Sequence, residues 1–193
     1  IDPENIISNY GADSVRLFIL SDSPPEKDVQ WSEEGIAASH KFIQKLWTLH
    51  TKIVEEIGKD HSENVGDELI KFTNKFIKKI SNNLENFSYN IIVANLHEMH
   101  SFFIKEISKG YKKSTILDNY KKILITMNPI IPHLSNECLK IFENTDEITW
   151  PSYDENQIKE NSSLIVIQIN GKKRGLIKTD SSLSETEIMK LVY

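Results

Sequence analysis

The sequence predicts a mainly α-helical fold, in which a helix bundle is followed by a truncated α+β module that starts with a β-hairpin. Amphipathic segments with apolar residues at helical spacing follow one another from about residue 32 to residue 142. Short polar links separate them, and each apolar stripe must be buried against another, as in a bundle. After Trp150-Pro151 the pattern changes to a continuous β-branched run and a hairpin turn.

Residues 1–31 are expected to form a connector ahead of the bundle. Apolar residues at helix spacing predict a short helical lead-in over residues 1–20. The pair Pro24-Pro25 ends this lead-in, because proline lacks the backbone donor that a helix needs. A loop that starts at Glu26 is then expected to be pinned at its end by Trp31.

The helical domain is expected over residues 32–150. Its first helix begins at Ser32, a suitable N-cap, and ends at Gly58. The apolar side of this helix is expected to carry Ile43, Leu46, Trp47, Ile53, Val54 and Ile57. Further helices are expected over about residues 67–84, 88–107, 115–127 and, after Pro129 and Pro132, to about residue 142.

Residues 151–193 are expected to form the start of a C-terminal α+β domain, which is incomplete. The run Leu164 to Ile169 predicts a strand, Asn170-Gly171 a two-residue turn, and Lys172 to Thr179 the return strand. Ser184 with Glu187 forms a capping box for one more short helix. A hairpin with one stub of helix buries little area, so this second module is expected to be incomplete. Both ends of the chain are expected to be cut from a longer protein.

Composition permits a sizeable core and narrows the function. Hydrophobic residues make up 39% and charged residues 26% of the 193 residues, which argues against wholesale disorder. A net charge of -5 argues against a generally basic nucleic-acid coat, although it allows a local basic face. The single cysteine, Cys138, indicates a reducing compartment, the cytoplasm. No apolar run approaches the roughly 20 residues that cross a bilayer, so no membrane partner is expected.

No catalytic or metal-binding motif stands out. The chain has no Gly-rich phosphate loop, CxxC, HExxH or GxSxG motif. His97 and His100 could begin a metal site on one helix, but no third ligand has suitable spacing. The favoured interpretation is that His100 packs near the apolar stripe and that His97 is solvated. His50 and Cys138 are expected to belong to the core. His133 is expected to help to cap the fifth helix.

Lysine rows are the most informative polar feature. They comprise Lys41, Lys45 and Lys52; Lys71, Lys75 and Lys78; Lys105, Lys109, Lys112 and Lys113; and Lys172, Lys173, Arg174 and Lys178. One such row is usually the solvated face of an amphipathic helix. Several rows in an acidic protein favour at least one contact with phosphate, through the nucleic-acid backbone rather than through stacked bases.

Several segments resemble class I aminoacyl-tRNA synthetases. The segment that follows their KMSKS loop is similar to Asp2-Pro3-Glu4 with Tyr10-Gly11-Ala12-Asp13-Ser14-Val15-Arg16-Leu17. The proline-rich joint of their helical anticodon-binding domain is similar to Asn128-Pro129-Ile130-Ile131-Pro132-His133 with Glu137. The leucine, isoleucine, valine and methionine enzymes share both. Residues 23–32 and 167–174, with Trp150-Pro151 between them, resemble the bacterial leucyl-tRNA synthetases more narrowly.

The resemblance implies that this chain is the tRNA-docking part of a longer, monomeric ligase. Neither the HIGH nor the KMSKS motif is present, so attachment of leucine with ATP and Mg²⁺ would reside in the N-terminal part. The chain alone is expected to be inactive, with no catalytic residue, cofactor or metal of its own. In this family the helical domain buttresses the body of the leucine-accepting tRNA, and the C-terminal domain reaches its elbow.

The candidate tRNA-binding residues are Lys41, Lys45, Lys172, Lys173 and Arg174. Lys41 and Lys45 match basic family positions that face tRNA, with lysine where relatives often carry arginine; this keeps the charge but lacks the bidentate fork. Two alternatives stay open. The chain could belong to an isoleucine- or valine-type synthetase, which the hairpin sequence disfavours, or it could be a non-enzymatic helical protein-interaction adaptor.

Overall fold

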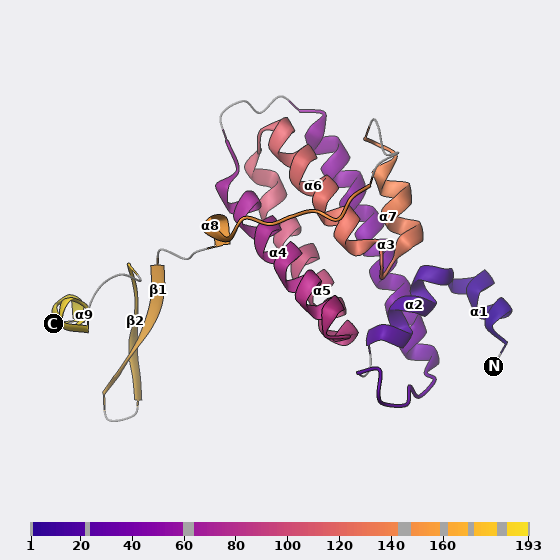
Figure 1. Cartoon of the computed structure of the whole chain (residues 1–193), viewed down its shortest axis with the longest axis horizontal. Helices are drawn as coiled ribbons and strands as arrows, with labels where there is room; N and C mark the ends of the chain where they lie inside the picture. The colour runs from indigo at the N-terminus through magenta and orange to yellow at the C-terminus, as the bar shows by residue number, and fades with distance from the viewer. Residues whose placement is uncertain are drawn as a thin grey trace. The chain divides into compact units, whose positions relative to one another are not determined.

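Two units make up the part of the chain that the computed structural model describes, which comprises residues 2–21, 24–59, 64–142, 148–158, 162–169, 172–180 and 185–192. The first unit, Ile1–Asp154, is a helix bundle, and the second, Glu155–Tyr193, contains a β-hairpin (Figure 1). The mainly α-helical fold with a small antiparallel hairpin is therefore confirmed. The finer division after residues 31 and 150 stays a prediction.

The helices of the first unit agree closely with the amphipathic segments of the sequence. They are α1 (Pro3–Tyr10), α2 (Ala12–Ser21), α3 (Glu33–Ile57), α4 (Asp67–Glu85), α5 (Tyr89–Glu106), the short 3-10 helix η1 (Ile107–Lys109), α6 (Lys113–Met127) and α7 (Pro132–Leu139). The lead-in over residues 1–20 is two helices rather than one. Gly11 separates them with a φ of 81°, which is strained for other residues.

The start of α3 is held as the sequence predicts. The Ser32 hydroxyl accepts a hydrogen bond from the Gly35 amide at 3.1 Å, and Trp31 packs edge-to-face on Phe18 with the ring centroids 5.3 Å apart. A Cβ atom at Gly35 would lie 2.5 Å from the buried Phe18 ring. Only glycine lets α2 and α3 approach this closely.

The buried face of α3 is rotated from the expected one. Trp47 and Val54 were expected on the apolar side, yet they are 45% and 38% exposed. The line that is buried against the other helices comprises Phe42, Leu46, Leu49 and Ile53. The bundle therefore selects one of two apolar stripes that the sequence of α3 offers, because α3 packs on α2, α5 and α6 together.

A buried polar chain crosses the core of the bundle. His50 Nδ1 lies 3.0 Å from the hydroxyl of Tyr120, which also hydrogen-bonds the thiol of Cys138. Burial lowers the pKa of His50 and raises the pKa of the Cys138 thiol to about 11. Both side chains belong to the core, as the sequence indicates, and neither is presented to solvent as a reactive group.

Helix α2 clamps the joint between α6 and α7. The Asp13 carboxylate accepts hydrogen bonds from the amides of His133 at 3.2 Å and Leu134 at 2.7 Å. Arg16 donates from Nε to the Ile130 carbonyl at 3.0 Å and from Nη2 to the Pro129 carbonyl at 2.7 Å. The expectation that His133 caps α7 was wrong: Asp13 supplies the cap, and His133 is exposed.

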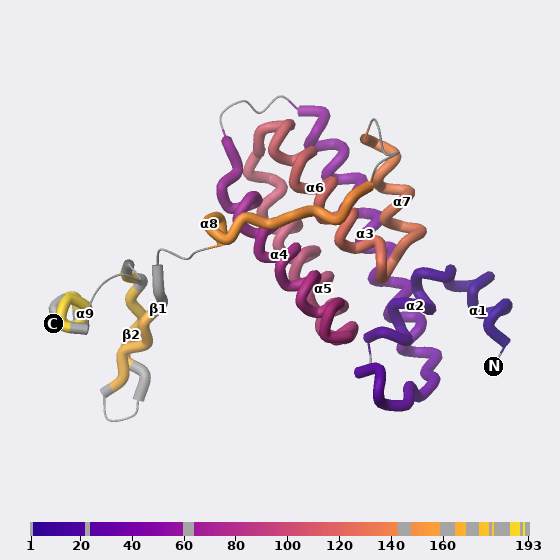
Figure 2. Tube along the Cα trace, viewed as in Figure 1, coloured from indigo at the N-terminus to yellow at the C-terminus, as the bar shows by residue number. Residues whose placement is uncertain are grey.

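An extended segment, residues 148–154, crosses the helices of the first unit (Figure 2) and contacts α4. Trp150 Nε1 donates to the Ser81 hydroxyl at 2.9 Å, and the Asp154 amide donates to Asn74 Oδ1 at 2.7 Å. Between these contacts the Lys78 ammonium lies 5.8 Å from the centroid of the Tyr153 ring. The segment therefore covers one side of α4 from its last turns towards its middle.

The second unit contains α8 (Glu155–Ile158), β1 (Ser162–Ile169), β2 (Lys172–Asp180) and α9 (Glu185–Val192). The strands pair antiparallel, which confirms the hairpin, while Asn170-Gly171 and Ser184 lie outside the described residues. Ile167 pairs with Gly175 and Gln168 with Lys173, so Arg174 is the extra residue of a β-bulge.

Candidate nucleic-acid interface

The exposed side of α3 presents a row of lysines. Lys41, Lys45 and Lys52 are all exposed and lie four and seven residues apart, which places them along one side of the helix. The Phe42 line of the same helix is buried in the bundle. Because the helix is anchored on that side, the lysines of α3 are held on an accessible face.

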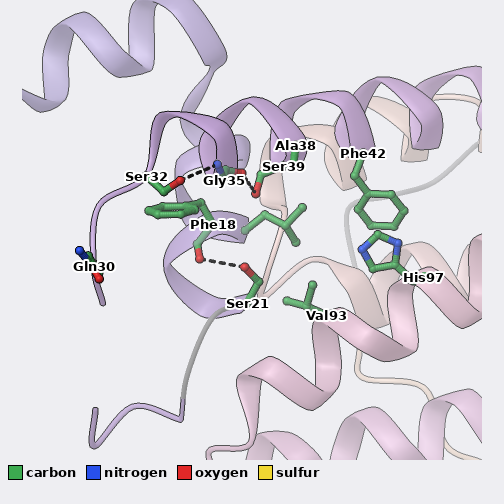
Figure 3. A pocket seen from close by; sticks show the side chains of 11 residues that line it. Phe18, Ser21, Gln30, Ser32, Gly35, Ala38, Ser39, Phe42, Val93 and His97 are labelled. Carbon is green, nitrogen blue, oxygen red and sulfur yellow. Dashed lines mark hydrogen bonds between the residues drawn. The ribbon is translucent and has the colours of Figure 1, made fainter. Parts of the chain in front are cut away.

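Two histidines of α5 lie against the same part of α3. The His97 ring stacks on the Phe42 ring with the centroids 3.6 Å apart and the planes inclined by 22° (Figure 3). The His100 ring lies edge-on to the Phe42 ring, with the two centroids 6.0 Å apart. His97 was expected to be solvated. The residue is exposed, but its ring stacks on Phe42.

Electrostatics join the lysines and the histidines into one group. Partial burial and then the positive charge of Lys45 lower the pKa of His97. The pKa of His100 is lowered most by burial, and then by the charges of Lys45, His97 and Lys52, in that order. We call Lys45, Lys52, His97 and His100 the α3–α5 patch. Like charges oppose protonation of its imidazoles, so an anion bound there would relieve the repulsion.

A charge change at Lys45 tests this grouping. Lys45→Gln is expected to raise the pKa of both His97 and His100 in the free chain, because it removes a positive charge that disfavours the protonated imidazoles. The measurement is an NMR titration of the imidazole Cε1 protons. Lys140→Gln on α7 is the matched control, since Lys140 pairs with Glu137 at 2.6 Å. Unchanged titration of both histidines in Lys45→Gln would show that Lys45 lies too far away.

Two lysines of the rows on α4 and at the end of α5 are engaged within the fold. Lys78 lies over Tyr153, and Lys109 pairs with Glu106 Oε2 at 2.6 Å. Glu106 also accepts a hydrogen bond from the Tyr111 hydroxyl at 2.8 Å, which ties this ion pair to the end of α5. These contacts make Lys78 and Lys109 weaker candidates for a phosphate contact than the lysines of α3.

The predicted site residues fall in both units. Lys41 and Lys45 lie together on α3, as the helix spacing requires. Lys172, Lys173 and Arg174 follow one another on β2, and Arg174 is exposed at the bulge. Their assignment to nucleic-acid binding stays a prediction.

A groove of about 350 Å³ adjoins the α3–α5 patch (Figure 3). Leu17 and Phe18 of α2, Ala38 and Ser39 of α3, and Val93 and His97 of α5 are among its lining residues. Sequence patterns could not reveal it, because its walls come from three helices that are distant in the chain. His97 belongs to both the groove and the patch.

Other kinds of site lack support. In the part of the chain that the structure describes, no cluster of three or more His, Cys, Asp or Glu side chains could hold a metal ion. His97 and His100 therefore have no third ligand among these residues. Within the same residues, no helix is both long and apolar enough to cross a membrane.

Comparison with known proteins identifies relatives. Residues 67–189 match the family described as the anticodon-binding domain of tRNA ligase. The leucine–tRNA ligase of Bartonella tribocorum is 36% identical over 205 residues, which cover 100% of this chain and 23% of that protein. The leucine–tRNA ligase of Prochlorococcus marinus subsp. pastoris is 34% identical over 199 residues, with 97% and 23% covered.

The solved structures include one with the same fold. The LeuRS of Agrobacterium radiobacter K84, solved as a ternary complex with tRNA and LeuAMS, superimposes with a TM-score of 0.80 at 20% identity. The match covers 100% of this chain and 26% of that one. This chain thus spans about a quarter of the length of the proteins it resembles.

Proposed function

Because the chain belongs to the family of anticodon-binding domains of tRNA ligases, we propose that it docks the leucine-accepting tRNA as part of a monomeric, cytoplasmic leucine–tRNA ligase. The observation that carries this proposal is the similarity to leucine–tRNA ligases over the whole chain, including its hairpin. This similarity also favours a leucine enzyme over the isoleucine or valine type. ATP, with Mg²⁺, and leucine are substrates of the rest of the ligase.

Docking uses the bundle and the hairpin in different ways. The lysines of α3 offer exposed charges on a rigid helix and contact backbone phosphates, which position the RNA without reading its sequence. Lys172, Lys173 and Arg174 concentrate cationic residues at one end of a short ribbon and contact a second stretch of backbone. Together the two surfaces hold the tRNA so that its 3′ end reaches the catalytic part, and such positioning can supply several kcal/mol of a reaction barrier.

The hairpin contribution has its own test. Replacing Lys172, Lys173 and Arg174 by alanine in the full-length ligase is expected to weaken tRNA binding. It should also flatten the plot of log affinity against log salt by up to about 2 to 3 units, from roughly 0.7 to 0.9 per phosphate contact. Fluorescence anisotropy with labelled tRNA between 50 and 300 mM salt measures both.

The alternative role for these cations is to guard an exposed strand edge against pairing with another chain. A triple mutant with wild-type affinity and slope that aggregates more readily would establish that role. It would also remove the hairpin from the tRNA-binding surface.

A further inference from the structure

On the face between α3 and α5, the rings of His97 and His100 both contact Phe42, and the positive charges of Lys45 and Lys52 act on them, although the protein as a whole is acidic. We infer that His97 and His100 complete a proton-coupled phosphate site with Lys45, whose ligand is a backbone phosphate of the docked RNA. This inference rests on the proposed function and deepens it. It adds to the lysines of α3 two residues of α5 that take up protons when RNA binds.

The geometry prepares the two rings for one ligand. Phe42 contacts both: it stacks against the face of His97 and meets His100 edge-on. Stacking covers one face of the His97 ring, so Phe42 does not cover the edge that carries the ring nitrogens (Figure 3). Lys45 is exposed and follows Phe42 by three residues on α3, so it projects from the next turn of the same helix. A phosphate oxygen could thus meet an ammonium and an imidazole from different helices.

Among the residues that the structure describes, no carboxylate is found to act on the pKa of these two imidazoles. From α3, Lys45 and Lys52 act on the imidazoles, and both are positive. On α5 the nearest acidic side chain in sequence is Glu98, which pairs with Lys79 of α4 at 2.7 Å.

Helix α2 also packs against α5, and its charged residues are engaged elsewhere. Asp13 holds the amides at the start of α7, and Arg16 holds the two carbonyls ahead of them. An external anion is therefore the partner that this concentration of positive charge can accept.

Proton uptake follows from the sign of the interactions. In the free protein, burial and the neighbouring lysine charge lower the pKa of both histidines, which favours neutral rings near pH 7. A phosphate placed against them favours the protonated rings and raises their pKa. Because the complex then holds more protons than the free protein, affinity must increase as the pH falls.

The test compares one double and one single glutamine variant with the wild type, all in the full-length ligase that contains this chain. His97→Gln/His100→Gln removes both titrating rings but keeps polar side chains of similar size. His133→Gln is the matched control, since His133 is exposed on α7. The dissociation constant of leucine-accepting tRNA is measured at pH 6.0 and 8.0 at constant ionic strength, and thermal unfolding verifies that each variant is folded.

The wild type and His133→Gln are expected to bind tRNA about three- to tenfold more tightly at pH 6.0 than at pH 8.0, since each pKa unit gained on binding corresponds to a factor of ten. The double variant should lose most of this difference. Equal pH dependence in all three proteins, with tRNA still bound through α3, would overturn the inference and leave the proposed function intact. Failure of the wild type to bind tRNA at either pH would overturn both.

A second arm separates RNA from free phosphate. Inorganic phosphate at 10 mM, replacing chloride at equal ionic strength, is expected to leave the imidazole titration of the 193-residue chain unchanged, because a single ion lacks the other contacts of RNA. If phosphate alone raises the pKa of both histidines and tRNA affinity shows no dependence on them, the site binds free phosphate and the RNA assignment is wrong.

Discussion

Reversing the charges of Lys41 and Lys45 to glutamate is expected to cause a large loss of tRNA affinity. Two unit charges about 4 Å apart interact by about 1 kcal/mol in water, so changing two attractions into two repulsions is worth at most about 4 kcal/mol, or roughly a thousandfold. Salt screening reduces this figure, and we expect a loss of at least about tenfold at 0.1 M salt. The salt slope should also fall by about 2.

The same variant is expected to keep its fold. Lys41 and Lys45 are exposed, and exposed substitutions typically move stability by about 0.5 kcal/mol or less. Lys112→Glu/Lys113→Glu is the matched control, since it reverses two exposed charges of the same unit near the start of α6. Leucine-dependent pyrophosphate exchange by the full-length ligase should persist in both variants. Wild-type tRNA affinity in the folded Lys41→Glu/Lys45→Glu protein would instead support a protein-interaction adaptor for this face.

Replacing Asp13 by alanine is expected to give the largest loss of stability among polar substitutions in the bundle, about 2 to 3 kcal/mol. Asp13 is 5% exposed, and its two oxygens accept the amides of His133 and Leu134. Loss of an N-cap typically costs about 1 kcal/mol, and each buried donor left unsatisfied costs about 1 to 3 kcal/mol. The change should therefore loosen α7 and the joint that precedes it.

Urea unfolding of the 193-residue chain, followed by far-ultraviolet circular dichroism, measures this effect. Asp118→Ala is the control, because Asp118 forms an exposed ion pair with Lys122 at 2.7 Å that is worth little. Arg16→Ala and the Asp13→Ala/Arg16→Ala double variant complete a double-mutant cycle, in which coupling is expected because both residues hold one joint. If Asp13→Ala destabilises no more than Asp118→Ala, the clamp does not determine the position of α7.

Short-range patterns were sufficient for the elements of the fold. The N-cap Ser32, the stop at Gly58 and the apolar periodicity predict α3 within a residue or two of its observed bounds. The β-branched run ahead of Lys172 likewise predicts both strands of the hairpin. Such features involve residues within a few positions of one another, so the backbone preferences that cause them are present in the sequence itself.

Contacts between distant residues decided the rest. The sequence of α3 offers Trp47 as well as Leu46 for burial. Only the packing of α3 on α2, α5 and α6 decides that Leu46 is buried and Trp47 is exposed. Asp13 reaches the amide of Leu134 across a sequence separation of 121 residues, so the cap of α7 could not be found from its own sequence.

The candidate site divides in the same way. The lysines of α3 follow from the sequence, because four-residue spacing places Lys41 and Lys45 on one face of any helix. That His97 and His100 join them was not predictable: their spacing shows only that they share a face of α5, whereas contact with Phe42 depends on how α5 packs against α3. Helix periodicity is a local property of the backbone, but the choice of which faces meet minimises the exposed apolar surface of the whole bundle, and that choice exists only in the tertiary structure.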